Sequence, residues 1–154
     1  MRIGIDIRKY SDFGIGTYIQ NLLVEFQKQS AHEYVYFASD EQRALLHQSF
    51  SGSFVSENSP KYSFKELFSL SQKANVEHLH LLHVPHYTLP IQLRMPSVVT
   101  IHDIIHVRLK EYFSIAQRSY AYLMLTHACR ASSSIIVNSE FTKRDVLERF
   151  RIDE

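Results

Sequence analysis

Apolar residues recur along the chain with two different periods. In residues 2–8, isoleucine occupies every second position, which is the period of a β-strand. From Ile15 to Phe26 the apolar residues are spaced three and four apart, which places them in one stripe along a helix. The pattern therefore predicts a strand that leads into a helix, with Gly14 and Gly16 at the junction.

The rest of the chain repeats this succession of strand and helix. The same periods predict strands at residues 33–39, 53–57, 78–84, 97–101 and 134–138, and helices at residues 40–50, 63–75, 115–131 and 138–150. The strands at 78–84, 97–101 and 134–138 are apolar along most of their length, which is typical of parallel strands covered on two faces. The alternation predicts an α/β fold with a three-layer, doubly wound parallel sheet of the Rossmann-like type.

Size and composition narrow the class of protein. A chain of 154 residues has room for one domain with a core, and no second full domain is expected in residues 1–154. Its 17 basic and 16 acidic residues nearly cancel, so no net charge indicates a nucleic-acid partner. The single cysteine, Cys129, favours a reduced, cytoplasmic setting. No signal peptide is recognisable, and no apolar run approaches the roughly 20 residues of a membrane-spanning helix.

The glycine pair follows the first strand, and ligands of parallel sheets bind beyond the carboxyl ends of strands. Gly14 and Gly16 also precede a helix, whose free amide groups suit a phosphate or diphosphate. A flexible turn explains the two glycines equally well. A dinucleotide fingerprint fits poorly, because Ile19 replaces its third glycine and six residues separate Ile7 from Gly14.

Four of the nine histidines, His78, His80, His83 and His86, lie close together in the sequence. Alternation along a strand would put His78 and His80 on one face and His83 on the other, so they are not expected to converge on one metal ion. We therefore predict no metal site.

A second histidine motif, "HDIIH", begins at His102. It imitates the zinc-protease motif H-E-x-x-H, which needs both histidines on one helix face, whereas His102 directly follows the strand at 97–101. His102 beside Asp103, at the carboxyl end of a strand, suits hydrogen bonding to a polar ligand. The alternative is that His102 ties its loop to the core.

These features together resemble the amino-terminal domain of a family-4 retaining glycosyltransferase of the GT-B fold (glycosyl transferases group 1). The first part of the resemblance is "RIGIDIR" followed by the loop "FGIGTY". The stronger part is a strand that ends in "HD", an aromatic-rich helix, and "IVNSEFTKRD" at residues 136–145. The match covers essentially the whole chain and is weak from about residue 40 to residue 75.

The resemblance implies roles for particular residues. It implies a catalytic role near the reacting sugar for His102. The substrate-binding residues that it implies, facing the donor diphosphate and the acceptor or shaping the crevice around them, are Gly14, Gly16, Thr17, Asp103, Ser139 and Glu140. Helix capping is a sufficient explanation for Ser139 and Glu140. The family needs no obligatory metal or other cofactor, so none is expected.

The resemblance also implies partners. Residues 1–154 would be the acceptor-side domain, and the carboxy-terminal donor-binding domain, encoded in the same gene or as a separate chain, is absent from this sequence. The substrates would be a nucleoside-diphosphate sugar and a glycan or lipid-linked acceptor. We expect the chain alone to fold but to be inactive as a transferase.

Lipid-linked acceptors would bring the chain to the inner face of the membrane. The stretch "KYSFKELF", with Lys61, Phe64, Lys65 and Phe68, could touch lipid there or be an ordinary surface helix.

Two other functions remain open at this point. One is a non-catalytic binding or assembly module that kept the fold and lost the chemistry. The other is a small nucleotide-binding α/β enzyme, which binding of NAD rather than UDP or GDP sugars would reveal.

Overall fold

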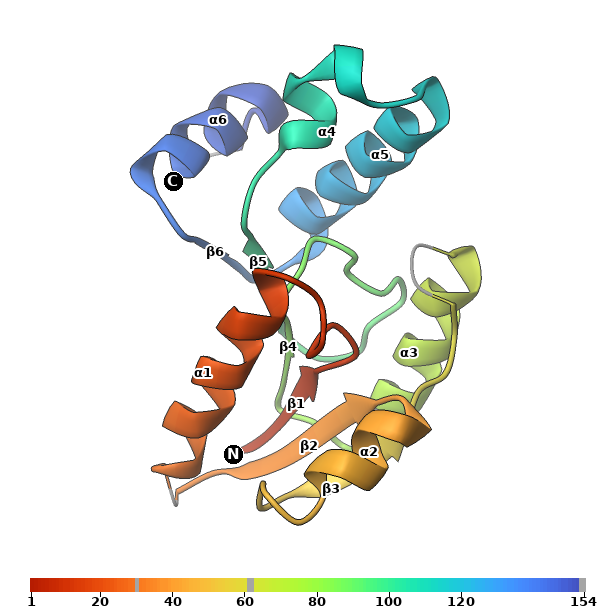
Figure 1. The fold of residues 1–154 in the computed structure, drawn as a ribbon, viewed down its shortest axis with the longest axis vertical. Coiled ribbons are helices and arrows are strands. Elements are labelled where there is room, and N and C mark those ends of the chain that lie inside the picture. Colours follow the sequence, from red (N-terminus) through yellow and green to blue (C-terminus); the bar gives the residue numbers. More distant parts are fainter. Residues whose placement is uncertain (30, 61–62, 153–154) are drawn as a thin grey trace.

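The chain folds into a single sheet with helices on both faces (Figure 1). The computed structural model describes residues 1–29, 31–60 and 63–152. Six strands, all parallel, lie in the order β3-β2-β1-β4-β5-β6. The strands are β1 (Arg2–Asp6), β2 (Glu33–Ala38), β3 (Ser53–Ser56), β4 (Leu81–Val84), β5 (Ser97–Ile101) and β6 (Ser134–Val137). The predicted α/β fold with a parallel, Rossmann-like sheet is confirmed.

The helices fall into two layers. They are α1 (Ile15–Gln27), α2 (Asp40–Leu46), α3 (Phe64–Val76), α4 (Ile105–Arg108), the 3₁₀ turn η1 (Lys110–Tyr112), α5 (Ile115–Ala131) and α6 (Glu140–Phe150). Ile5 of β1 packs in one core with α1 and α2, whereas Leu82 of β4 packs in a second core with α3, α5 and α6. Figure 1 shows α1 and α3 on opposite sides of β1 and β4.

Local signals predicted where helices begin. Ser63 caps α3 by accepting a hydrogen bond from the amide of Glu66, and Ser139 caps α6 by accepting one from the amide of Thr142. Cys129 is buried, as expected of a packed small residue. Within the described residues, no helix is both long enough and apolar enough to cross a membrane.

The prediction of burial was wrong for the last strand. Within residues 1–29, 31–60 and 63–152, β6 is an edge strand that pairs with β5 alone. Ser134 is exposed and Ile136 keeps 41% of its surface in solvent. A run of apolar residues indicates burial on two faces only when both faces are covered, and the outer face of β6 is open to solvent in the described structure.

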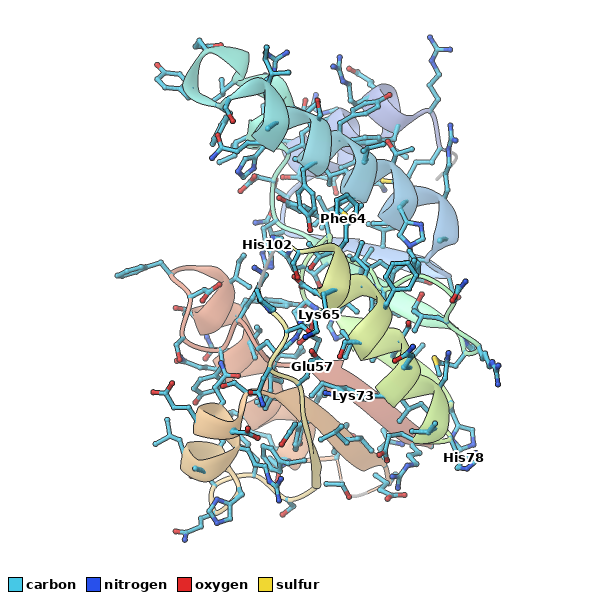
Figure 2. The ribbon with its side chains drawn as sticks, turned by 90° about the vertical axis from the view of Figure 1, so that its right-hand side faces the viewer. Glu57, Phe64, Lys65, Lys73, His78 and His102 are labelled. Atoms are coloured by element: carbon cyan, nitrogen blue, oxygen red, sulfur yellow. The ribbon has the colours of Figure 1, made fainter. Side chains whose placement is uncertain are left out.

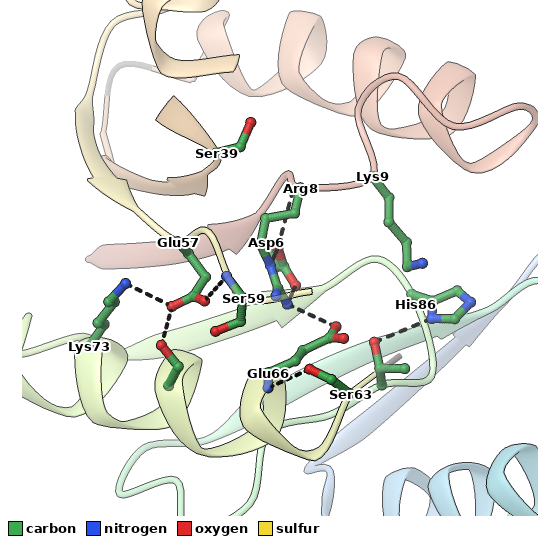
Figure 3. A network of polar contacts seen from close by, with 12 residues as sticks. Asp6, Arg8, Lys9, Ser39, Glu57, Ser59, Ser63, Glu66, Lys73 and His86 are labelled. Atoms are coloured by element: carbon green, nitrogen blue, oxygen red, sulfur yellow. Dashed lines mark hydrogen bonds and ion pairs between the residues drawn. The ribbon is translucent and has the colours of Figure 1, made fainter. Parts of the chain in front are cut away.

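A buried ion cluster fastens the carboxyl end of β1 to α3 (Figure 3). The Arg8 guanidinium donates to Asp6 through Nε (2.8 Å to Oδ1) and Nη2 (2.7 Å to Oδ2), and Nη2 lies 3.1 Å from Glu66 Oε1. All three side chains are less than 10% exposed. Burial by itself would lower the pKa of Arg8, but the Asp6 and Glu66 carboxylates outweigh it and raise that pKa.

A second buried carboxylate fastens β3 to the same helix. Glu57 follows β3 and accepts from the Ser69 hydroxyl (2.7 Å), from Lys73 Nζ (2.9 Å) and from the Ser59 amide (2.9 Å). Burial would raise the pKa of Glu57, but these hydrogen bonds outweigh it and lower the pKa to about 2. The carboxyl ends of β1 and β3 are therefore both held to α3 by charge.

The ion cluster predicts a large loss of stability in Arg8→Ala. Removing the guanidinium leaves Asp6 and Glu66 buried without their cation, which should lower the free energy of unfolding by about 3–5 kcal/mol. Urea unfolding followed by circular dichroism measures this. The control Lys28→Ala removes an exposed ion pair with Glu25 and should cost no more than about 0.5 kcal/mol. Equal stability of the two variants would contradict a structural role for the cluster.

Candidate functional site

The strand order creates a switch point at the carboxyl edge of the sheet, where a ligand crevice is expected. β1 and β4 are neighbours, yet the chain leaves β1 toward α1 on one face and reaches β4 from α3 on the other. Ligands of open parallel sheets bind at such a switch point. The segments that follow β1, β4 and β5 carry the glycine loop, Pro85 with His86, and His102 with Asp103.

Gly14 is required by the shape of the loop. Its backbone has φ 66° and ψ −64°, and the Ile15 amide donates to the Phe13 carbonyl over 2.7 Å. These features define a γ-turn with positive φ, a rare and strained conformation for residues that carry a Cβ. A Cβ at Gly14 would meet no atom within 4 Å, so the open space beside it leaves the backbone accessible.

Gly16 is required for a different reason. A Cβ there would lie 2.4 Å from the Tyr10 carbonyl oxygen, because the loop folds back against the first turn of α1. The Gly16 amide also donates to the Asp12 carbonyl over 2.7 Å. Gly16 is buried, so it serves the folding of the loop directly.

The start of α1 keeps hydrogen-bond donors free. No side chain in the described part of the chain caps the helix. The amides of Ile15, Gly16 and Tyr18 donate to carbonyls of the loop, but among the described residues the Thr17 amide has no such acceptor. Thr17 is exposed. The amino end of α1 therefore presents an open amide and a hydroxyl to the crevice, which suits an anion.

His102 is held at the other side of the crevice. Its Nε2 lies 3.1 Å from the Pro85 carbonyl oxygen, and its ring meets the Tyr18 ring edge to face, with centroids 5.1 Å apart and planes at 79°. A carbonyl can only accept, so Nε2 carries the hydrogen of this bond, and Nδ1 bears the lone pair whenever the ring is neutral. Among the described residues, Nδ1 has no hydrogen-bond partner.

Comparison with known protein families shows where the chain belongs. A model of Glycosyltransferase Family 4 matches residues 14–154. The chain belongs to glycosyltransferase family 4. No curated protein matches it. The chain, called the family 4 domain below, is thus an amino-terminal domain of a glycosyltransferase with a Rossmann-like fold. The matched residues run from the glycine loop to α6.

The remaining predicted residues lie at the starts of α4 and α6. Asp103 is exposed, and its Oδ1 accepts from the Ile105 amide (3.1 Å) at the start of α4. Ser139 caps α6, and the Thr142 hydroxyl donates to the His102 carbonyl (3.3 Å), so the start of α6 is tied to the same segment. Glu140 is exposed in the first turn of α6. These contacts are structural, and substrate contact by these residues stays a prediction.

The family 4 domain separates the four clustered histidines. His80 lies at the amino edge, where its Nδ1 accepts from the Arg2 amide (3.0 Å), and Figure 2 shows His78 far from His102. Residues 78 and 80 precede β4, so the alternation predicted for them does not apply. Among the described residues, no group of three or more histidine, cysteine, aspartate or glutamate side chains could hold a metal ion.

The sequence analysis did not identify Lys9, a buried basic residue that precedes the two glycines of the loop. Lys9 is buried, with its Nζ 3.7 Å from Asp12 Oδ2, and Figure 3 shows it extending toward His86. Burial, then the charges of Lys9 and His102, hold the pKa of His86 well below its ordinary value. A charged residue directly after an apolar strand was the signal that could have identified Lys9.

The glycine geometry predicts that Gly16→Ala destabilises the domain. The new Cβ would overlap the Tyr10 carbonyl, and relief of such overpacking costs about 1–3 kcal/mol. Urea unfolding measures the difference. Ser11→Ala, at an exposed position of the same loop, is the control and should change stability by less than about 0.5 kcal/mol. A Gly16→Ala domain as stable as the control would refute the close approach.

The buried His83 predicts acid sensitivity. Burial, then the charge of His102, lowers the pKa of His83 from 6.5 to about 4. Between these two pH values the unfolded chain binds a proton at His83 and the folded chain does not. The free energy of unfolding should therefore fall as the pH drops from 6.5 toward 4, by about 3 kcal/mol for this group.

Urea unfolding at several pH values tests this dependence. His83→Gln should flatten the pH dependence of stability in that window, whereas His32→Gln, at an exposed position before β2, should leave it unchanged. An unaltered slope in His83→Gln would contradict a buried neutral imidazole.

Proposed function

We propose that the family 4 domain is the acceptor-side half of an enzyme that transfers a sugar from a nucleoside-diphosphate donor to an acceptor with retention of anomeric configuration. One observation carries the proposal: the uncapped start of α1 and His102 lie together at the switch point, where the His102 ring contacts Tyr18 of the same helix. Family membership supports the reaction class.

The start of α1 acts on the leaving group. Transfer breaks the bond between the anomeric carbon and the diphosphate, and negative charge develops on the diphosphate oxygens. Preorganised amides stabilise such charge without reorganisation, and the free Thr17 amide at the positive end of the α1 dipole is one. The γ-turn at Gly14 leaves this approach open because no side chain occupies it.

His102 acts on the sugar. With Nε2 held by the Pro85 carbonyl, the ring offers Nδ1 as an acceptor for a sugar hydroxyl. A ring held from two sides needs little reordering when substrate binds, so it can orient the sugar as the bond breaks. Asp103, Ser139 and Glu140 shape the same end of the crevice.

The proposed reaction requires further partners. A second, donor-binding domain, in the same gene or on a separate chain, would supply the basic groups that neutralise the rest of the diphosphate charge. The acceptor would be a glycan or a lipid-linked sugar. For a lipid-linked acceptor the cytoplasmic face of the membrane is the proposed location, and Phe64 and Phe68 of α3 are exposed as such contact requires. Lys61, also predicted for this contact, lies outside the described residues, and the ring of Phe64 lies 6.3 Å from that of Tyr120.

The proposal predicts the effect of removing the His102 ring. In the chain combined with its donor-binding domain, His102→Ala should lower kcat/KM for sugar transfer by about 100-fold with the fold intact, because one transition-state contact is lost. His32→Ala, at the amino edge of the sheet, is the matched control and should be fully active. Transfer from UDP and GDP sugars is measured, with circular dichroism as the check on folding.

The chain alone should turn over neither donor at an enzymatic rate. Normal turnover by the chain alone, unchanged transfer in His102→Ala, or binding of NAD in place of sugar nucleotides would each overturn the proposed function.

A further inference from the structure

A hydrogen bond joins the helix of the glycine loop to the strand that carries His102. Tyr18 is half-buried in the second turn of α1, and its hydroxyl lies 3.2 Å from Thr100 Oγ1. Thr100 is 1% exposed on β5, two residues before His102. The contact spans 82 residues of sequence, so it fixes α1 against a distant part of the chain.

The same threonine reaches a third element. His83 of β4 is 5% exposed, and its Nε2 lies 3.0 Å from Thr100 Oγ1. A hydroxyl can donate one hydrogen bond and accept another, so Thr100 satisfies Tyr18 and His83 at once. Tyr18, Thr100 and His83 therefore form a continuous hydrogen-bonded relay from α1 through β5 to β4.

The elements of the relay are also those that hold His102. The Pro85 carbonyl, two residues beyond His83, accepts from His102 Nε2, and the Tyr18 ring abuts the His102 ring. A shift of α1 would move the Tyr18 ring, and a shift of β4 would move the Pro85 carbonyl. The relay opposes both movements because it connects α1 and β4 through the strand that leads into His102.

We propose that Tyr18, Thr100 and His83 are positioning residues that hold the start of α1 and the His102 ring in one arrangement, with Nε2 protonated and Nδ1 free. This inference rests on the proposed function for its purpose, but the arrangement itself belongs to the chain alone. Tyr18 positions His102 by ring contact, and Thr100 and His83 position Tyr18 through its hydroxyl.

Packing alone gives no reason for these polar groups. Valine and phenylalanine would fill the places of Thr100 and Tyr18 without the cost of burying hydroxyls. The number of protons on the relay does not change near neutral pH. Burial lowers the pKa of His83 to about 4, so its ring stays neutral there. Buried polar networks in which every member is satisfied make one arrangement rigid and unique.

Nuclear magnetic resonance of the ring nitrogens of His102 tests the relay. In the ¹⁵N-labelled chain at neutral pH, long-range ¹H–¹⁵N spectra should show His102 as the Nε2–H tautomer. Tyr18→Phe keeps the ring and removes only the oxygen, and Thr100→Val keeps the shape and removes the hydroxyl. In both variants the His102 ring signals should shift, and the fraction of the Nδ1–H tautomer should rise severalfold.

Conservative and distant variants serve as controls. Thr100→Ser retains the hydroxyl and should restore the wild-type ring signals. Tyr122→Phe and Thr126→Val, both on the surface of α5, should leave the His102 signals unchanged. If Thr100→Val fails to fold, Tyr18→Phe alone decides. His102 signals in Tyr18→Phe that match those of Tyr122→Phe would overturn the relay.

The experiment separates the relay from the proposed function because it contains no sugar nucleotide. Shifted His102 signals, together with no sugar transfer by the chain combined with a donor-binding domain, would support the relay and refute the transferase. Unshifted signals in a protein that does transfer sugar would refute the relay and leave the transferase standing.

Discussion

The parallel pairing of β1 with both β2 and β4 is the constraint on which the site depends. Because all strands point the same way, their following loops gather at one edge of the sheet. Because the chain leaves β1 on one face and reaches β4 from the other, the two strands form a switch point, which is where open parallel sheets bind ligands. The glycine loop, Pro85 and His102 meet there for this reason, although about 70 or more residues of sequence separate the loop from the other two.

The sequence was sufficient for features that depend on local spacing. Strand and helix periods predicted the six parallel strands, and capping was anticipated for Ser139, because a cap acts within one turn. Contacts between distant segments could not be predicted this way. Arg8 donates a hydrogen bond to Glu66, which is 58 residues away in the sequence. The exposure of Ile136 depends on which strand lies at the edge of the sheet. The glycines were noticed, but the γ-turn at Gly14 and the Tyr10 carbonyl beside Gly16 appear only in three dimensions.

Buried charged side chains and buried neutral polar side chains hold different elements of this domain together. The carboxylates of Asp6, Glu57 and Glu66 hold the ends of β1 and β3 to α3, on one side of the crevice. Neutral groups, the Tyr18 hydroxyl and the His83 ring among them, hold α1 to β5 and β4 on the other side. The proposed site thus lies between two sets of buried contacts, and family 4 membership indicates that the domain belongs to a glycosyltransferase.

The central claim is that substrate binds between the start of α1 and His102. Amide chemical-shift mapping of the ¹⁵N-labelled chain together with the proposed donor-binding domain, during titration with UDP and GDP sugars, tests this claim most directly. The account predicts that the largest shifts occur at Gly14, Thr17, Tyr18 and His102, at the carboxyl edge of the sheet. Shifts confined to the amino edge, around His32 and His80, or no shifts at all, would contradict it.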